Sequence, residues 1–308
     1  MKWVVGALIA VVVGWAVVST TAAAPVSIDE TSLKFLPADT IGIAFIDMNG
    51  LRSSPLAQDF LKTSNKSVYP RDLQEFSAAT GLKPEQDLDK ITAAKISAQE
   101  GIVIAQGRID RFKVEQFFKD RGQRTEAYLG QSFYVDGDRA VAVFDNLVVA
   151  GQLNALKKAI DHMQVPGSAP LRSELRNAIQ TIEAGNQVWA VGEFSVADVQ
   201  AVGVQPPSVE ILKSLRNGSY QMRLDTGLHA RAIGNFADAE SARNLEDMAN
   251  GALGLARLNV AGRQPEFAQL LDGIQVSASG NALTIRIEQS GELLEKLKNA
   301  RMIDPKLQ

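Results

Sequence analysis

The triplet Asp225-Thr226-Gly227 is the feature of this sequence that comes closest to known catalytic chemistry. Aspartic proteases carry Asp-Thr-Gly, and their mechanism needs two carboxylates that share one proton. The chain contains no second such triplet. The same residues are also common in turns, and the flanking segments Tyr220–Leu224 and Leu228–Asn235 have strand character. We therefore predict a hairpin turn at this position and no protease site.

Histidines and paired carboxylates give no stronger signal. The sequence has two histidines, His162 and His229, which are too few for most zinc or copper sites. His162 falls on the polar side of a predicted helix, and His229 alternates outward beside Arg231 on a predicted strand. We expect both to be surface residues. Asp136-Gly137-Asp138 lacks the later oxygen ligands of a calcium loop and is expected to be a turn.

Other motifs of reactive or cofactor-binding sites are absent from the sequence as well. The chain has no nucleophile elbow, no phosphate-binding loop and no dinucleotide fingerprint. It has no cysteine, which excludes lipoprotein anchoring, iron–sulfur ligation, c-type haem attachment and thiol nucleophiles. We expect no catalytic residue, no metal and no cofactor, and the ligand is unknown. Asp47, Glu100 and Glu193 would form an acid–base site only if the fold brought them together.

The N-terminus has the layout of an export signal. Lys2 precedes the uncharged apolar segment Trp3–Val18, which is followed by the small polar stretch Ser19–Ala24 and then Pro25. A membrane-spanning helix needs about 20 apolar residues, so Trp3–Val18 is short for a span and slightly long for a signal core. We predict that residues 1–24 are a signal peptide or a membrane anchor. The protein is then periplasmic, or membrane-anchored with its C-terminal part outside the cytoplasm.

Charge disfavours a nucleic-acid partner. The sequence holds 35 acidic and 32 basic residues, a net charge of −3 with neutral histidines. Nonspecific binding to nucleic acid depends on a basic surface that neutralises phosphates. The composition is otherwise that of an ordered globular protein, and without disulfides the exported fold must rest on its hydrophobic core.

The remaining chain divides into two predicted halves. Residues 25–34 form a spacer, residues 35–165 a first half, and residues 166–308 a second half. Each half contains a lone strand, helices, paired strands and a closing helix. The strand, glycine and helix order of residues 102–110 repeats in residues 229–237, which suggests an internal duplication. Because hairpins dominate, we expect an α+β fold of mainly antiparallel sheets with helices packed on one face, preceded by the N-terminal apolar helix.

The predicted helix Ala242–Leu258 is unusually rich in small residues. It contains Gly251 and Gly254 among several alanines. Small residues allow a strand, another helix or a ligand to approach closely. Ordinary core packing and a lipid-lined cleft both fit this composition.

One stretch supports a resemblance. Phe35-Leu36-Pro37-Ala38-Asp39-Thr40, followed by a strand and then Ser54-Pro55-Leu56, resembles uncharacterised exported bacterial proteins. Those proteins share a membrane-targeted N-terminus, a Leu-Pro-x-Asp-Thr approach to the first strand, and two similar α+β halves. The resemblance implies a bacterial source, export and a duplicated fold. It implies no activity.

The sequence therefore predicts a non-enzymatic extracytoplasmic binding or accessory protein. Three alternatives stay open. The first is a single-span accessory subunit of a membrane protein complex, held through Trp3–Val18. The second is a carrier of a lipid or another apolar ligand. The third is a hydrolase whose carboxylates converge only in the folded chain.

Overall fold

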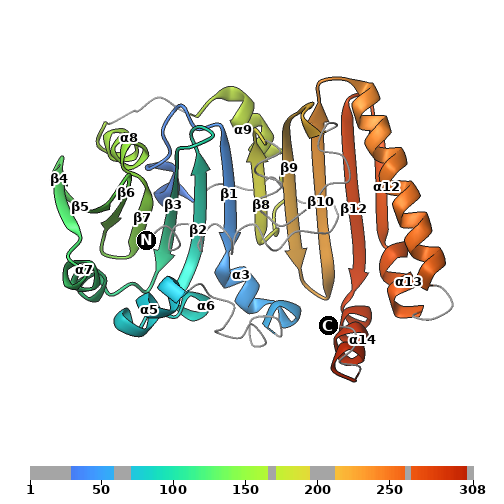
Figure 1. Cartoon of the computed structure of the whole chain (residues 1–308), viewed down its shortest axis with the longest axis horizontal. Helices are drawn as coiled ribbons and strands as arrows, with labels where there is room; N and C mark the ends of the chain where they lie inside the picture. The colour runs from blue at the N-terminus through green and yellow to red at the C-terminus, as the bar shows by residue number, and fades with distance from the viewer. Residues whose placement is uncertain (1–28, 59–70, 166–170, 195–211, 261–264, 304–308) are drawn as a thin grey trace.

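The computed structural model describes residues 29–58, 71–165, 171–194, 212–260 and 265–303 (Figure 1). The predicted signal or anchor Trp3–Val18 lies outside these residues. Among the helices that are described, none is both long enough and apolar enough to cross a membrane.

A single twelve-stranded sheet runs through the described chain (Figure 1). Its strand order is β11-β12-β10-β9-β8-β1-β2-β3-β7-β6-β5-β4, and every recorded pairing is antiparallel. The α+β class predicted from the hairpins is confirmed. The strands are β1 Gly42–Asp47, β2 Leu88–Lys95, β3 Gly101–Gly107, β4 Arg124–Tyr128, β5 Gln131–Asp136, β6 Arg139–Val143, β7 Leu147–Gln152, β8 Val188–Gly192, β9 Leu215–Leu224, β10 Gly227–Phe236, β11 Ile274–Ser279 and β12 Ala282–Ser290.

Helices surround this sheet, and those of the first half cover both of its faces. The helices are α2 Glu30–Leu33, α3 Met48–Ser53, α5 Arg71–Thr80, α6 Pro84–Asp87, α7 Arg111–Asp120, α8 Leu153–Gln164, α9 Ser173–Gln180, α12 Ala239–Val260, α13 Pro265–Asp272 and α14 Gly291–Ile303. Ala105 packs with α5 and α7 in one core, whereas its neighbour Ile104 packs with α8 and α9 in another. Successive strand residues point to opposite faces. The expectation that helices pack on one face is therefore wrong here, and the consecutive buried residues of β3 are the physical reason.

The two predicted halves meet inside the sheet. β1 of the first half pairs with β8 of the second half, with Phe45 directly opposite Trp189. The two rings stack with their centroids 5.4 Å apart, and Trp189 is 0% exposed. The boundary predicted near residue 165 is therefore not a boundary of the sheet, because hydrogen bonds between strands cross it.

Turns formed at positions where the local sequence predicted them. Asp225 and Thr226 connect β9 to β10, so the hairpin predicted at the Asp-Thr-Gly triplet is confirmed. Gly137, with φ of 62°, turns the chain between β5 and β6 at the predicted Asp-Gly-Asp turn. The Leu-Pro-Ala-Asp-Thr stretch also forms a turn, in which the buried Thr40 hydroxyl donates to the Pro37 carbonyl oxygen over 2.6 Å.

Helix α12 covers β11, the strand at one end of the sheet (Figure 1). The Asn250 side chain donates to the Val276 carbonyl oxygen over 3.4 Å, and Arg257 donates to the Ile274 carbonyl oxygen over 3.5 Å. Covering an edge strand with a helix prevents unwanted pairing with other chains. The outer side of α12 remains open, where Leu255 and Leu258 are exposed.

Replacing the glycines of α12 by alanine is expected to stabilise the protein. A Cβ at Gly251 or Gly254 would meet no atom within 4 Å. Because glycine inside a helix costs about 0.5–1 kcal/mol relative to alanine, Gly251→Ala and Gly254→Ala should each raise the free energy of unfolding by about that amount. Urea denaturation measures this change. Gly151→Ala is the matched control and should destabilise, because its Cβ would lie 2.2 Å from the Gly101 carbonyl oxygen. A loss of stability in the α12 variants would mean that another segment occupies this side of the helix.

Candidate binding cleft

A cleft lies where β1 ends and β8 begins, and these strand ends are at the lower side of the sheet in Figure 1. It has a volume of about 840 Å³ and is open to solvent. Five separate stretches of sequence contribute to it: the start of α2, the end of β1 with α3, the start of β2, the residues before β8, and the β9–β10 turn. The lining residues are Asp29, Glu30, Phe45, Asp47, Gly50, Ser53, Ser54, Pro55, Lys90, Gly185, Asn186, Gln187, Leu224, Asp225 and Thr226. We call this site the end cleft.

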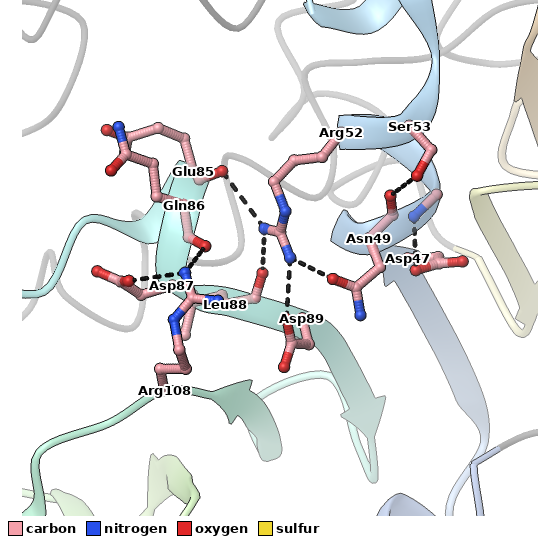
Figure 2. Close-up of polar contacts among 11 residues, drawn as sticks. Asp47, Asn49, Arg52, Ser53, Glu85, Gln86, Asp87, Leu88, Asp89 and Arg108 are labelled. Atoms are coloured by element: carbon pink, nitrogen blue, oxygen red, sulfur yellow. Dashed lines mark hydrogen bonds and ion pairs between the residues drawn. The ribbon is translucent and has the colours of Figure 1, made fainter.

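Asp47 joins the sheet to the first wall of the end cleft. It is the last residue of β1 and the N-cap of α3, where its Oδ1 accepts a hydrogen bond from the Gly50 amide over 3.0 Å (Figure 2). Aspartate is a preferred N-cap because its carboxylate satisfies an amide that the helix leaves unpaired. The backbone amide of Asp47 donates to the Gln187 carbonyl oxygen over 2.6 Å. Within the described residues, Asp47 Oδ2 has no hydrogen-bond partner.

Arg52 fixes α3 against the sheet from behind this wall (Figure 2). Its Nη1 donates to the carbonyl oxygens of Leu88 over 2.5 Å and Glu85 over 3.3 Å. Its Nη2 pairs with Asp89 Oδ1 over 2.9 Å and also donates to Asn49 Oδ1. One guanidinium thus holds α3, α6 and the start of β2 together, which positions the α3 residues that line the end cleft.

Arg108, the residue after β3, supports the same corner (Figure 2). It donates to the Gln86 carbonyl oxygen over 2.6 Å and pairs with Asp87 Oδ1 over 3.1 Å. The Lys83 amide, followed by Arg108, holds the pKa of Asp87 below its usual range despite partial burial. Asp87 therefore stays ionised and keeps α6 in the position that gives Arg52 its carbonyl acceptors.

The second wall is an ion pair between α2 and β2. Asp29 Oδ1 accepts from Lys90 Nζ over 2.9 Å, and Asp29 Oδ2 accepts from Gln106 Nε2 over 2.9 Å and the Ser32 amide over 3.2 Å. Burial by itself would raise the pKa of Asp29, but the bonds from Lys90 and Gln106 outweigh it and lower the pKa. The charge of Lys90 is therefore already engaged.

The third wall is the β9–β10 turn. Asp225 Oδ2 accepts from Arg223 Nε over 2.8 Å, and Asp225 Oδ1 accepts from the Gly227 amide over 3.1 Å and lies 2.9 Å from His229 Nε2. Burial acts to raise the pKa of Asp225, but the Gly227 amide and the charges of His229 and Arg223 lower it overall. On the other side of the ring, His229 Nδ1 lies 2.8 Å from Glu288 Oε2.

The polar groups of the end cleft include two carboxylates that pair with no basic side chain among the described residues, beside hydroxyls of Ser54 and Thr226 that donate to none of them. Lys90 is paired with Asp29, and the Ser53 hydroxyl donates to the Asn49 carbonyl oxygen. No described residue donates to the Glu30 carboxylate, to Asp47 Oδ2 or to Oδ1 of Asn186, a residue that is buried. The end cleft can accept hydrogen bonds and positive charge. The described residues hold no cluster of three or more acidic or histidine side chains arranged for a metal ion.

The three carboxylates considered as an acid–base site do not come together. Asp47 lies in the end cleft, but Glu193 follows β8 and Glu100 precedes β3, both at the opposite end of the antiparallel strands. There Glu100 pairs with Lys158 over 3.5 Å and Glu193 with Arg172 over 3.9 Å. Distance along the strands separates them.

The two histidines, both expected to be surface residues, have different surroundings in the structure. His162 lies near the surface, with Nδ1 3.2 Å from the Lys34 carbonyl oxygen. His229 is half-buried, with 23% of its side chain exposed, and it contacts two carboxylates. The strand pairing of His229 with Glu288 depends on the neighbouring strand β12, which the alternation within β10 cannot identify.

Comparisons with known proteins support the fold alone. The sequence matches no protein-family model and no curated protein. Among solved structures, it is similar to crystal form III of TP0453 with a TM-score of 0.53 and 11% identity, over 89% of this chain and 99% of that one. Crystal form I of TP0453 gives a TM-score of 0.50 and 10% identity, over 89% and 98%. The similarity extends over nearly the whole of both chains and agrees with the α+β architecture.

Proposed function

We propose that this chain is a non-enzymatic extracytoplasmic binding protein whose end cleft receives a cationic group of its ligand or partner. The observation that carries the proposal is that two carboxylates of one cleft, Asp47 and Glu30, pair with no basic side chain among the described residues. Asp47 and Glu30 offer carboxylate oxygens, and Asn186 offers an amide oxygen. An ammonium or guanidinium group supplies only donors and positive charge, which is the complementary chemistry.

The state of the carboxylates supports binding over proton transfer. A general acid or base at neutral pH needs a pKa near the working pH. Asp29 and Asp225 instead have lowered pKa values, and both are engaged with basic side chains. Carboxylates of this kind stay ionised at neutral pH, which suits recognition of a ligand better than proton transfer.

The proposal includes export, which the N-terminal sequence supports. Lys2, the apolar segment Trp3–Val18 and the small residues up to Ala24 support delivery across a membrane. Intact-mass measurement of the protein from native membrane and soluble fractions tests this. We expect either a soluble chain that begins near Ala24 or an intact chain in the membrane fraction. An intact chain found only in the soluble cytoplasmic fraction would contradict export.

The same measurement separates the main proposal from the single-span accessory subunit. An uncleaved Trp3–Val18 that co-purifies with a defined membrane complex would favour the accessory role.

We also propose that the two halves arose by duplication. The strand-to-helix passages from β3 to α7 and from β10 to α12 coincide with the repeated sequence order of residues 102–110 and 229–237.

A further inference from the structure

We propose that His229 is a proton-dependent clamp, which fastens the β9–β10 turn to strand β12 when its ring carries two protons and releases one side when it loses one. This goes beyond the proposed binding function and does not depend on it. The clamp has three parts on three segments. Asp225 lies in the turn, His229 on β10 and Glu288 on β12.

The geometry places one carboxylate at each ring nitrogen. His229 Nε2 lies 2.9 Å from Asp225 Oδ1, and His229 Nδ1 lies 2.8 Å from Glu288 Oε2. A doubly protonated ring donates to both oxygens. A neutral ring has a single N–H, so one nitrogen would direct its lone pair at a carboxylate. Both contacts therefore form together only with the imidazolium.

Several other charged side chains surround the ring and its two carboxylates. Arg223 lies opposite His229 on β9 and pairs with Asp225. Arg231, on the same strand as His229, is directed to Glu183 over 3.2 Å, and it lies opposite Arg286 of β12. In α14, which contacts β10 and β12, Glu292 pairs with Lys296 over 2.7 Å. Glu288 is thus the carboxylate across the strand pair that meets His229 directly.

The turn that the clamp fastens forms one wall of the end cleft. Asp225 and Thr226 line that cleft, and the Thr226 carbonyl oxygen accepts from the Gly291 amide at the start of α14 over 3.0 Å. Loss of one histidine contact leaves the turn held mainly by Arg223 and its own backbone. We therefore expect the cleft wall formed by residues 225–226 to loosen as pH rises.

Thermal unfolding at pH 5.5 and pH 8.5 tests the clamp, and the chain offers a matched control in its other histidine. If the folded state favours the doubly protonated ring through its two carboxylate contacts, the wild-type Tm should be at least about 2 °C lower at pH 8.5 than at pH 5.5. The sign follows from the clamp, since the stabilising contact needs the proton and is lost on deprotonation. His162→Gln should keep this fall, and His229→Gln should abolish it.

A second measurement keeps the test decisive if His229→Gln folds poorly. In an NMR pH titration of the wild-type protein, the amides of Thr226 and Gly227 should shift with the same midpoint as the His229 ring. Glu288→Gln, which keeps the side-chain shape and removes its charge, should reduce the pH dependence of Tm. The clamp is wrong if His229→Gln retains the wild-type dependence, or if the two amides do not follow the His229 ring.

Discussion

Replacement of Trp189 by alanine is expected to lower the free energy of unfolding by about 3–5 kcal/mol, the range for truncation of a large aromatic side chain in a core. Trp189 is fully buried and stacks on Phe45 where β8 of the second half pairs with β1 of the first. The cavity would therefore open at the contact that joins the two halves. Chemical denaturation followed by circular dichroism measures the change.

Trp189→Phe is the matched control. The indole Nε1 of Trp189 is buried without a hydrogen-bond partner among the described residues, so phenylalanine loses no hydrogen bond and removes an unsatisfied donor. We expect Trp189→Phe to cost less than half as much as Trp189→Ala. If both variants unfold like the wild type, Trp189 does not join the two halves in the way described.

Replacement of Arg52 by alanine has the second largest expected effect, a loss of about 2–3 kcal/mol. Only 24% of the Arg52 side chain is exposed, and removing it leaves two carbonyl oxygens and the Asp89 carboxylate without their donor. Hydrogen–deuterium exchange should show faster exchange in α3. Arg52→Lys should recover only part of the loss, because an ammonium group cannot reproduce the planar set of guanidinium donors.

Arg108 provides the comparison for Arg52. Its side chain is 69% exposed, and its ion pair with Asp87 is correspondingly solvated. Exposed ion pairs contribute about 0–1 kcal/mol, so Arg108→Ala should cost clearly less than Arg52→Ala. Equal losses in the two variants would show that burial does not distinguish their roles.

The sequence predicted the parts of the fold that local patterns determine. The Asp225-Thr226-Gly227 and Asp136-Gly137-Asp138 turns formed where expected, because turn residues act within a few positions of the chain. The two-sided helix packing was missed because it depends on a global arrangement. The consecutive buried residues Ile102–Ala105 carried the available signal, since a strand with one solvated face would alternate.

The end cleft could not be assembled from the sequence. Asp29 lies 61 positions from Lys90 and 77 positions from Gln106, and only the fold brings them together. Each polar residue also has an ordinary local role. Asp47 caps a helix and Asp225 stabilises a turn. Neither residue can be assigned to a site until the structure shows that their strand ends are neighbours.

The measurement that tests the account most directly compares binding of N-methylguanidinium and N-methylurea by NMR. The two probes have nearly the same shape, but only the first carries a positive charge. We predict saturable shifts of the Gly50, Asn186 and Gln187 amides with N-methylguanidinium and none with N-methylurea. Asp47→Asn should weaken this binding several-fold while the fold persists, because asparagine caps a helix as well as aspartate. Equal responses to both probes, or unchanged binding in Asp47→Asn, would contradict a cation-binding end cleft.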